Sequence, residues 1–184
     1  MNNLWNFIQF QVGWFAVVLG AAAGYPLWGA AGALALLVVH LWLAADPWLE
    51  GAFLLLVGLL GWLWESLVFG AGLVQYPGYG VVMAPLWMAA LWMNFASTLD
   101  YSLAWMQGKP VLAAVFGGVG GPLAFVAGEQ LGAIVLVDRV LSLGVIGAGW
   151  LVVTPLLLRA AQAWQGGLQA GATRGGALEV ASDR

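Results

Sequence analysis

Few side chains in this sequence could take part in acid–base or binding chemistry, and they lie within long apolar stretches. The ionisable ones in such surroundings are His40, Glu65, Asp100 and Glu129. A charged group in an apolar environment costs several kcal/mol unless it is paired or hydrated, so each is a candidate for function. A carboxylate or an imidazole there could bind a ligand, move a proton or hold a neighbouring helix.

Glu65 is the candidate to which this argument applies most directly, because it lies late in the apolar segment of residues 48–69. At 100° per residue, Gly58, Gly61 and Gly72 lie on its helix face, and small residues let another helix approach closely. We therefore expect Glu65 to face another helix, where it could handle a ligand or proton, or pair with Arg139. The alternative is a structural bond between helices.

Aromatic and amide side chains form a second candidate group, between residues 87 and 105. A continuous helix there would place Trp87, Asn94, Thr98, Tyr101 and Trp105 on one face. Rings that stack, together with a few fixed polar groups, are typical of a small-ligand pocket. The alternative is that the aromatic residues lie at membrane interfaces while Asn94 and Thr98 bond a neighbouring helix.

A third group combines residues from three segments. Asn6, Gln9, His40 and Asp100 should reach similar depth, and clustering would reduce the cost of burying them. A pair of His40 and Asp100 could act as base and orienting group, or be purely structural. Glu129 is expected at the water boundary.

The composition identifies the class of protein that must position these residues. Of 184 residues, 63% are apolar and 7% are charged, against about 25% charged in soluble domains. Mean hydropathy is +0.94, and the chain is rich in Trp (12) and Gly (27). A soluble fold is excluded, and a net charge of −3 without a basic cluster argues against nucleic-acid binding. With no Cys and one His, we expect no metal site and no cofactor.

The apolar segments predict an all-α bundle of six transmembrane helices. A spanning helix needs about 20 apolar residues. The segments are residues 4–22, 26–45, 48–69, 83–106, 111–131 and 140–161. The fifth contains a glycine run before Pro122, which favours a kinked helix over a re-entrant one.

The distribution of cations predicts which side the ends of the chain face. With six spans, the termini share a side with Lys109, Arg159, Arg174 and Arg184, whereas Arg139 lies opposite. By the positive-inside rule both termini are cytoplasmic. We expect a membrane domain over residues 1–163 and a disordered cytoplasmic tail over 164–184.

Several stretches resemble a known family in order and spacing. They are Asn6-Phe7 with Phe10-Gln11 and Trp14-Phe15, then Trp87-Met88 with Leu91-Trp92 and Phe95-Ala96, and finally Gly121-Pro122-Leu123 with Phe125 and Gly128. The chain resembles the bacterial inner-membrane proteins catalogued as domain of unknown function 2878. The resemblance implies a multi-pass inner-membrane protein and supplies neither a reaction nor a catalytic residue.

The short catalytic inventory favours a non-catalytic role. We expect an accessory or binding subunit for a lipid, a small apolar ligand or a membrane partner, in contact with membrane lipids and with another membrane protein or a second copy of itself. One alternative is the solute-binding component of a small-molecule transporter, similar in size and topology to energy-coupling-factor subunits. The other is an integral-membrane enzyme that modifies lipids through Glu65, or through Asp100 with His40.

Overall fold

A computed structural model describes the chain over residues 2–80 and 83–182, with side chains described as far as residue 166. Within these residues the fold is all-helical apart from one short sheet, as the composition predicts. The helices are α1 (Asn3–Ala22), α2 (Pro26–Trp42), α3 (Pro47–Gly70), α4 (Trp87–Ala96), the 3-10 turn η1 (Ala104–Met106), α5 (Pro110–Gln130) and α6 (Arg139–Ser182). Strands β1 (Val74–Gln75) and β2 (Val135–Leu136) pair antiparallel.

Four of these helices are long and apolar enough to cross a membrane. They are α1, α3, α5 and the part of α6 that runs from Arg139 to Gly166. Helix α2 is apolar too, but has 17 residues. These helices are typical of a membrane protein, while six complete spans and the side that the termini face stay predictions.

Proline, glycine and capping side chains mark where the helices begin and end. Pro26, Pro47 and Pro110 each stand at the first position of a helix, where the missing N–H costs nothing. The Asp46 side chain accepts a hydrogen bond from Leu49 N at 3.1 Å and so caps α3. Gly108 has φ +74°, which lets the chain turn into α5.

The fourth segment departs from expectation. Instead of one helix over residues 83–106, α4 covers ten residues, roughly 15 Å of rise, and a series of turns follows. Side-chain hydroxyls help to end it: Ser97 Oγ donates to Asn94 O at 2.7 Å, and Thr98 Oγ1 donates to Phe95 O at 2.6 Å. These bonds satisfy carbonyls that a helix end leaves free.

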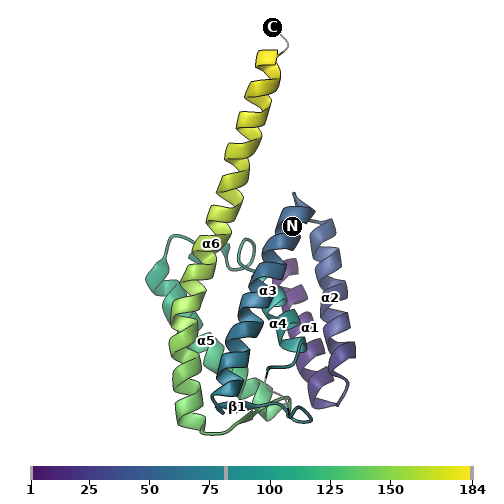
Figure 1. Cartoon of the computed structure of the whole chain (residues 1–184), viewed down its shortest axis with the longest axis vertical. Coiled ribbons are helices and arrows are strands. Elements are labelled where there is room, and N and C mark those ends of the chain that lie inside the picture. The colour runs from purple at the N-terminus through teal and green to yellow at the C-terminus, as the bar shows by residue number, and fades with distance from the viewer. Residues whose placement is uncertain (1, 81–82, 183–184) are drawn as a thin grey trace.

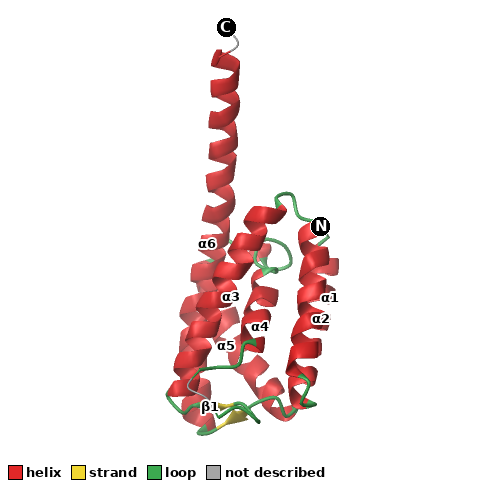
Figure 2. Cartoon of the chain, turned by 45° about the vertical axis from the view of Figure 1, so that its right-hand side comes forward, coloured by secondary structure: helices red, strands yellow, loops and turns green. Residues whose placement is uncertain are grey.

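The helices form pairs around the short α4. Helices α1 and α2 make one pair, α5 and α6 another, and α3 packs on α4 between them (Figure 1). The strands join the loop before α4 to the loop after α5 at one end of the bundle (Figure 2). The N-terminus and α6 beyond residue 163 lie toward the other end (Figure 1).

Two expectations about the later helices have different outcomes. Helix α5 is continuous from Pro110 to Gln130 with Pro122 inside it, so it is not re-entrant. Helix α6 continues to Ser182, past residue 163, where we expected the membrane domain to end. Side chains after residue 166 lie outside the described residues, and the expected disorder of the tail stays a prediction.

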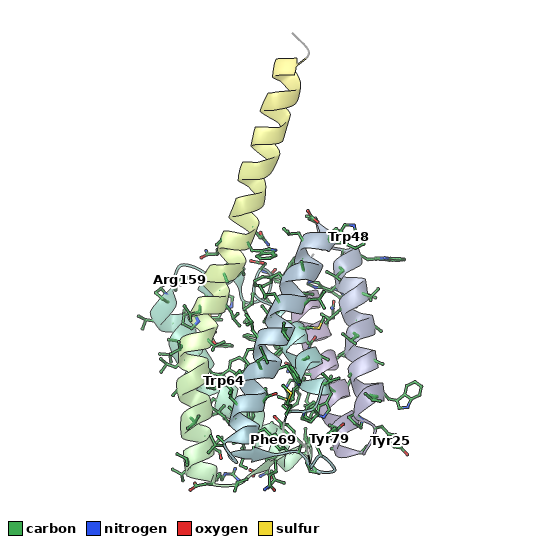
Figure 3. All side chains as sticks on the ribbon, viewed as in Figure 1. Tyr25, Trp48, Trp64, Phe69, Tyr79 and Arg159 are labelled. Atoms are coloured by element: carbon green, nitrogen blue, oxygen red, sulfur yellow. The ribbon has the colours of Figure 1, made fainter. Side chains whose placement is uncertain are left out.

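Exposed aromatic residues mark both ends of the bundle. Trp48 is 91% exposed at one end and Tyr25 is 65% exposed at the other, and both point outward (Figure 3). Trp42 and Trp28, at the two ends of α2, are 86% and 79% exposed. Tryptophan and tyrosine favour membrane–water interfaces, so two such levels fit a bundle that sits in a bilayer.

Candidate functional site

An aromatic pocket of about 460 Å³ lies between α1 and α5, with α4 and α6 behind it. Its volume is within the range of small-molecule sites, roughly 300–1,000 Å³. Exposed Phe7 and Phe15 of α1 and Phe116 of α5 stand on its rim. Ten of its lining residues are aromatic: Phe7, Phe10, Trp14, Phe15, Trp87, Trp92, Phe95, Phe116, Phe125 and Trp150.

Glu65 is the one ionisable residue among those that line the pocket, all of which belong to the described part of the chain. Its side chain is fully buried. Trp92 Nε1 donates to Glu65 Oε1 at 3.2 Å, and the Tyr76 hydroxyl donates to Oε2 at 3.5 Å. Burial raises the pKa of Tyr76 well above its usual value, and the nearby Glu65 carboxylate raises it further. Tyr76 therefore keeps its proton and remains a donor.

The structure confirms that Glu65 faces another helix. A Cβ on Gly58 or Gly61 would overlap Met93 or Trp92 of α4, so these glycines provide the close approach that their spacing suggested. Gly72, however, lies beyond the end of α3, in a turn with φ +72°. Arg139 is not the partner of Glu65: its Nη1 donates to Glu129 Oε2 at 2.7 Å.

A pair of stacked indoles forms the inner wall of the pocket. The rings of Trp92 and Trp150 lie 4.8 Å apart at an angle of 16°. Two glycines make room for them, because a Cβ on Gly61 would overlap the Trp92 ring and a Cβ on Gly121 would overlap Trp150. The stack joins the α3–α4 pair to the α5–α6 pair.

Three polar atoms that are enclosed by the protein, on residues that line the pocket, have no hydrogen-bond partner among the described residues. They are Trp87 Nε1, Trp150 Nε1 and Thr154 Oγ1, all on residues that line the pocket. Most buried polar groups in folded proteins are paired, so these three atoms are exceptions; their lack of accessible surface separates them from the open space of the pocket.

The predicted ligand-binding residues do not all meet. Glu65, Trp87 and Thr98 line the pocket, whereas Asn94 and Tyr101 do not. Because α4 ends at Ala96, Thr98, Tyr101 and Trp105 do not share a helix face with Trp87, and the single polar stripe was wrong. The Asn94 amide instead donates to Phe10 O at 2.9 Å, the bond to a neighbouring helix that we gave as the alternative.

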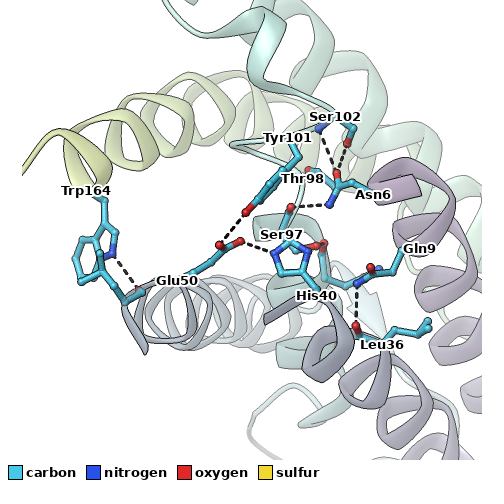
Figure 4. Close-up of polar contacts among 12 residues, drawn as sticks. Asn6, Gln9, Leu36, His40, Glu50, Ser97, Thr98, Tyr101, Ser102 and Trp164 are labelled. Atoms are coloured by element: carbon cyan, nitrogen blue, oxygen red, sulfur yellow. Dashed lines mark hydrogen bonds and ion pairs between the residues drawn. The ribbon is translucent and has the colours of Figure 1, made fainter. Parts of the chain in front are cut away.

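A separate polar group contains His40, which the sequence placed beside Asp100. The structure pairs His40 Nε2 with Glu50 Oε1 instead, and the Tyr101 hydroxyl donates to Glu50 Oε2 at 3.0 Å (Figure 4). Burial raises the pKa of Tyr101, and the negative charge of Glu50 raises it further. The group fastens the turns after α4 to the facing ends of α2 and α3.

The other members of the predicted polar cluster have separate partners. Asn6 and Gln9 are buried; the Asn6 amide donates to Ser97 O, and the Gln9 amide donates to Leu36 O, both at 2.9 Å (Figure 4). Asp100 Oδ1 accepts a hydrogen bond from Gln107 Nε2 at 2.8 Å. The four residues thus have four separate sets of partners, and the predicted cluster does not form.

Asp100 is expected to make the stability of the protein depend on pH. Burial raises the pKa of Asp100 above 3.8, although hydrogen bonds from Gln107 and Gln165 oppose the shift. A carboxyl whose pKa is higher when folded stabilises the fold at low pH, and this contribution is lost as the pH rises through the folded pKa. Asn at this position keeps an oxygen to accept from Gln107 and does not ionise. We expect the melting temperature of Asp100→Asn, relative to that of the parent, to rise as the pH increases above about 4. A difference between the two melting temperatures that stays constant with pH would contradict this.

Sequence reasoning missed Glu50, Trp150, Thr154 and Gly120. Glu50 was not among the candidates, although its place one turn into α3 was a signal that it could face α2. Trp150 and Thr154 are four residues apart, which is one helix face, but an apolar helix gives no sign of which face is covered. Among the described residues, no group of three or more His, Asp or Glu side chains could hold a metal ion.

Comparison with known proteins places the chain in one sequence family. A family model described as "Protein of unknown function (DUF2878)" matches residues 3–156. No curated protein and no solved structure matches the chain significantly. The family resemblance found in the sequence is thereby confirmed, and the match covers the helices from α1 to α5, the first part of α6 and all residues that line the pocket.

Proposed function

The chain belongs to the DUF2878 family of proteins of unknown function, and from this premise we propose that it is a non-catalytic membrane protein that binds a small, mostly apolar molecule. The observation that carries the proposal is the aromatic pocket, which has one buried carboxyl group, that of Glu65, among its lining residues. A predominantly apolar cavity with a few convergent polar groups is the usual form of a small-molecule site.

The polar groups of the pocket favour binding over catalysis. Three hydroxyl side chains belong to its lining residues. Thr98 and Ser102 donate hydrogen bonds to Phe95 O and to Asn6 Oδ1, and Thr154 Oγ1 is buried without a partner among the described residues. None of the three is bonded to a base, which a hydroxyl nucleophile would need. His40 contacts Glu50 and Tyr101 and does not line the pocket.

The position of the pocket supports entry from within a membrane. It runs beside α1 and α5, two of the helices long enough to cross a bilayer, and its rim carries exposed phenylalanines. A lipid-soluble molecule could enter there without crossing water. We place the protein in the bacterial inner membrane with both termini cytoplasmic, because six spans would put four of its five cations (Lys109, Arg159, Arg174 and Arg184) on the same side as the termini.

Gly120 offers a test that blocks the pocket without disturbing the helices. Gly120 lines the pocket, and a Cβ there meets no atom within 4 Å. Gly120→Leu should fill the cavity, while Gly144→Leu adds the same side chain where a Cβ also meets nothing, away from the pocket. In native mass spectrometry from mild detergent, we expect the parent and Gly144→Leu to retain a small-molecule adduct that Gly120→Leu loses. An adduct kept by Gly120→Leu would place the molecule elsewhere.

A further inference from the structure

Gln11 is a polar residue in the middle of the α1 face that lines the aromatic pocket. Phe7, Trp14, Phe15 and Val18 line the pocket together with it. These five residues follow one another at intervals of three or four, which places them on one face of the helix. The Gln11 side chain therefore leaves α1 on the side of the pocket.

The Gln11 carboxamide has no hydrogen-bond partner within the described residues. By contrast, its neighbour Gln9 donates to Leu36 O at 2.9 Å (Figure 4). Gln11 is half-buried, and its amide atoms keep accessible surface, whereas Thr154 Oγ1 is enclosed by the protein. A molecule that enters the pocket can therefore reach the Gln11 amide.

The other oxygen-bearing side chains that line the pocket are enclosed or already bonded. Glu65, Thr98 and Thr154 are buried. Ser102 is half-buried, but its hydroxyl donates a hydrogen bond within the protein. Gln11 is thus the lining side chain that combines an accessible oxygen with the lack of a partner among the described residues.

The level of Gln11 in the bundle shows what kind of group could pair with it. Gln11 lies eight residues after the first residue of α1, roughly 12 Å along the helix axis. The apolar core of a bilayer is about 30 Å thick, so this level is well below the headgroups. An unpaired carboxamide there is unfavourable, and the acyl chains around it offer no partner. The partner is a polar group that lies within the apolar layer.

The recess around Gln11 favours a small molecule over a helix of a second chain. Phe7 and Phe15, one turn before and one turn after it, are 47% and 45% exposed. Their rings stand farther out than the half-buried Gln11. A helix that approached α1 would meet these rings first, whereas a small molecule can pass between them.

The charges of the pocket limit the ligand to a neutral one. No Lys, Arg or His lines it, so an anion would lack a counter-ion. Glu65 is fully buried, and its two oxygens accept hydrogen bonds from Trp92 and Tyr76, so it is not free to pair with a cation. A carboxamide has one acceptor and two donors, and a neutral amide matches it with one acceptor and at least one donor.

We propose that Gln11 is the polar recognition residue of the pocket, and that its ligand is a neutral, mostly apolar molecule with an amide group inside its apolar body. This inference rests on the proposed function and names the group by which the ligand is recognised. The rings of the pocket pack against the apolar parts of the molecule, and the Gln11 carboxamide forms a hydrogen bond with its amide group.

Two molecules of nearly the same shape test this contact. Benzanilide has two phenyl rings joined by an amide group, and trans-stilbene has the same rings joined by a carbon–carbon double bond. Each is titrated against the full chain in mild detergent, and bound molecules are counted by native mass spectrometry. We expect the parent to bind benzanilide about fivefold more tightly than trans-stilbene, because one hydrogen bond is gained.

Gln11→Leu removes the carboxamide with little change in side-chain size. It should abolish the preference for benzanilide and leave the binding of trans-stilbene unchanged. Gln162→Leu, the matched control, removes an exposed carboxamide outside the pocket and should keep the preference. Gly120→Leu should block both compounds, and Gly144→Leu should block neither.

Thermal unfolding without either compound tests whether Gln11 lacks a partner in the protein. Gln11→Leu should melt at the parent temperature or above it, because no bond within the bundle is lost. Gln9→Leu, which removes the bond to Leu36 O, should melt lower. If Gln11→Leu lowers the melting temperature as much as Gln9→Leu does, the carboxamide is bonded within the bundle and the inference is overturned.

The outcomes separate this inference from the function beneath it. Equal binding of the two compounds, blocked by Gly120→Leu, would overturn the role of Gln11 and leave the binding function standing. A dimer of the parent that Gln11→Leu converts to monomers would also overturn it, in favour of a contact between two copies. Binding of neither compound, or binding that Gly120→Leu does not change, would overturn both.

Discussion

Gly61→Ala is expected to destabilise the bundle by about 3 kcal/mol or more, although it adds a single methyl group. That methyl would overlap the Trp92 ring. The ring cannot move aside easily, because it stacks on Trp150 on one side and donates to Glu65. Overpacking of this kind forces side chains from their rotamers or separates the helices.

Gly144→Ala is the matched control for Gly61→Ala. Both positions lie in helices, but a Cβ on Gly144 meets no atom within 4 Å. The change should be neutral or stabilise by about 0.5–1 kcal/mol, because Ala favours helix more than Gly does. Thermal unfolding in detergent, followed by tryptophan fluorescence, compares the two variants. Equal melting temperatures would show that the approach of α3 to α4 is looser than the structure has it.

Asn6→Ala should have the second large effect, a loss of about 3 kcal/mol. The buried Asn6 side chain donates to Ser97 O at 2.9 Å, and its Oδ1 accepts from Ser102 N at 3.1 Å and from Ser102 Oγ at 2.6 Å. The variant leaves these groups without a partner, and a buried unpaired group costs about 1–3 kcal/mol. The end of α4 and the turns after it would lose their attachment to α1.

Two further variants isolate the contribution of Asn6. Asn3→Ala removes an exposed amide one turn earlier in α1 and should unfold close to the parent temperature. Ser102→Ala removes one of the three bonds and should cost about 1 kcal/mol. If Asn6→Ala and Asn3→Ala have the same melting temperature, the three hydrogen bonds of Asn6 contribute no net stability.

The glycines divide into those that shape the bundle and those that leave space. Gly61 and Gly121 admit the two stacked indoles, and Gly117 lets α5 approach Thr154 and the backbone of α6. Gly120, between them in sequence, faces open space in the pocket. The spacing of the glycines showed that helices approach closely, but it did not separate these two uses, since both require a missing side chain.

The polar residues show how far a sequence determines its contacts. Burial of His40, Asn6 and Glu65 was expected from their apolar surroundings, and all three are fully buried. Their partners were not expected: His40 contacts Glu50, and Asn6 bonds a serine hydroxyl and the backbone of the turns after α4. Several partners satisfy the same hydrogen-bonding need, and only the packing selects among them.

The sequence by itself determined the class of the protein and the places of five of its helices. Long apolar runs between proline and glycine turns can satisfy their backbone groups only within a helix when no water surrounds them, and that rule is local to each run. The tertiary structure decided that α4 ends at Ala96, that His40 contacts Glu50, and that a pocket opens between α1 and α5. Each of these depends on side chains from distant parts of the chain. Several pairings of such side chains are compatible with the sequence, and close packing and hydrogen-bond geometry select one of them.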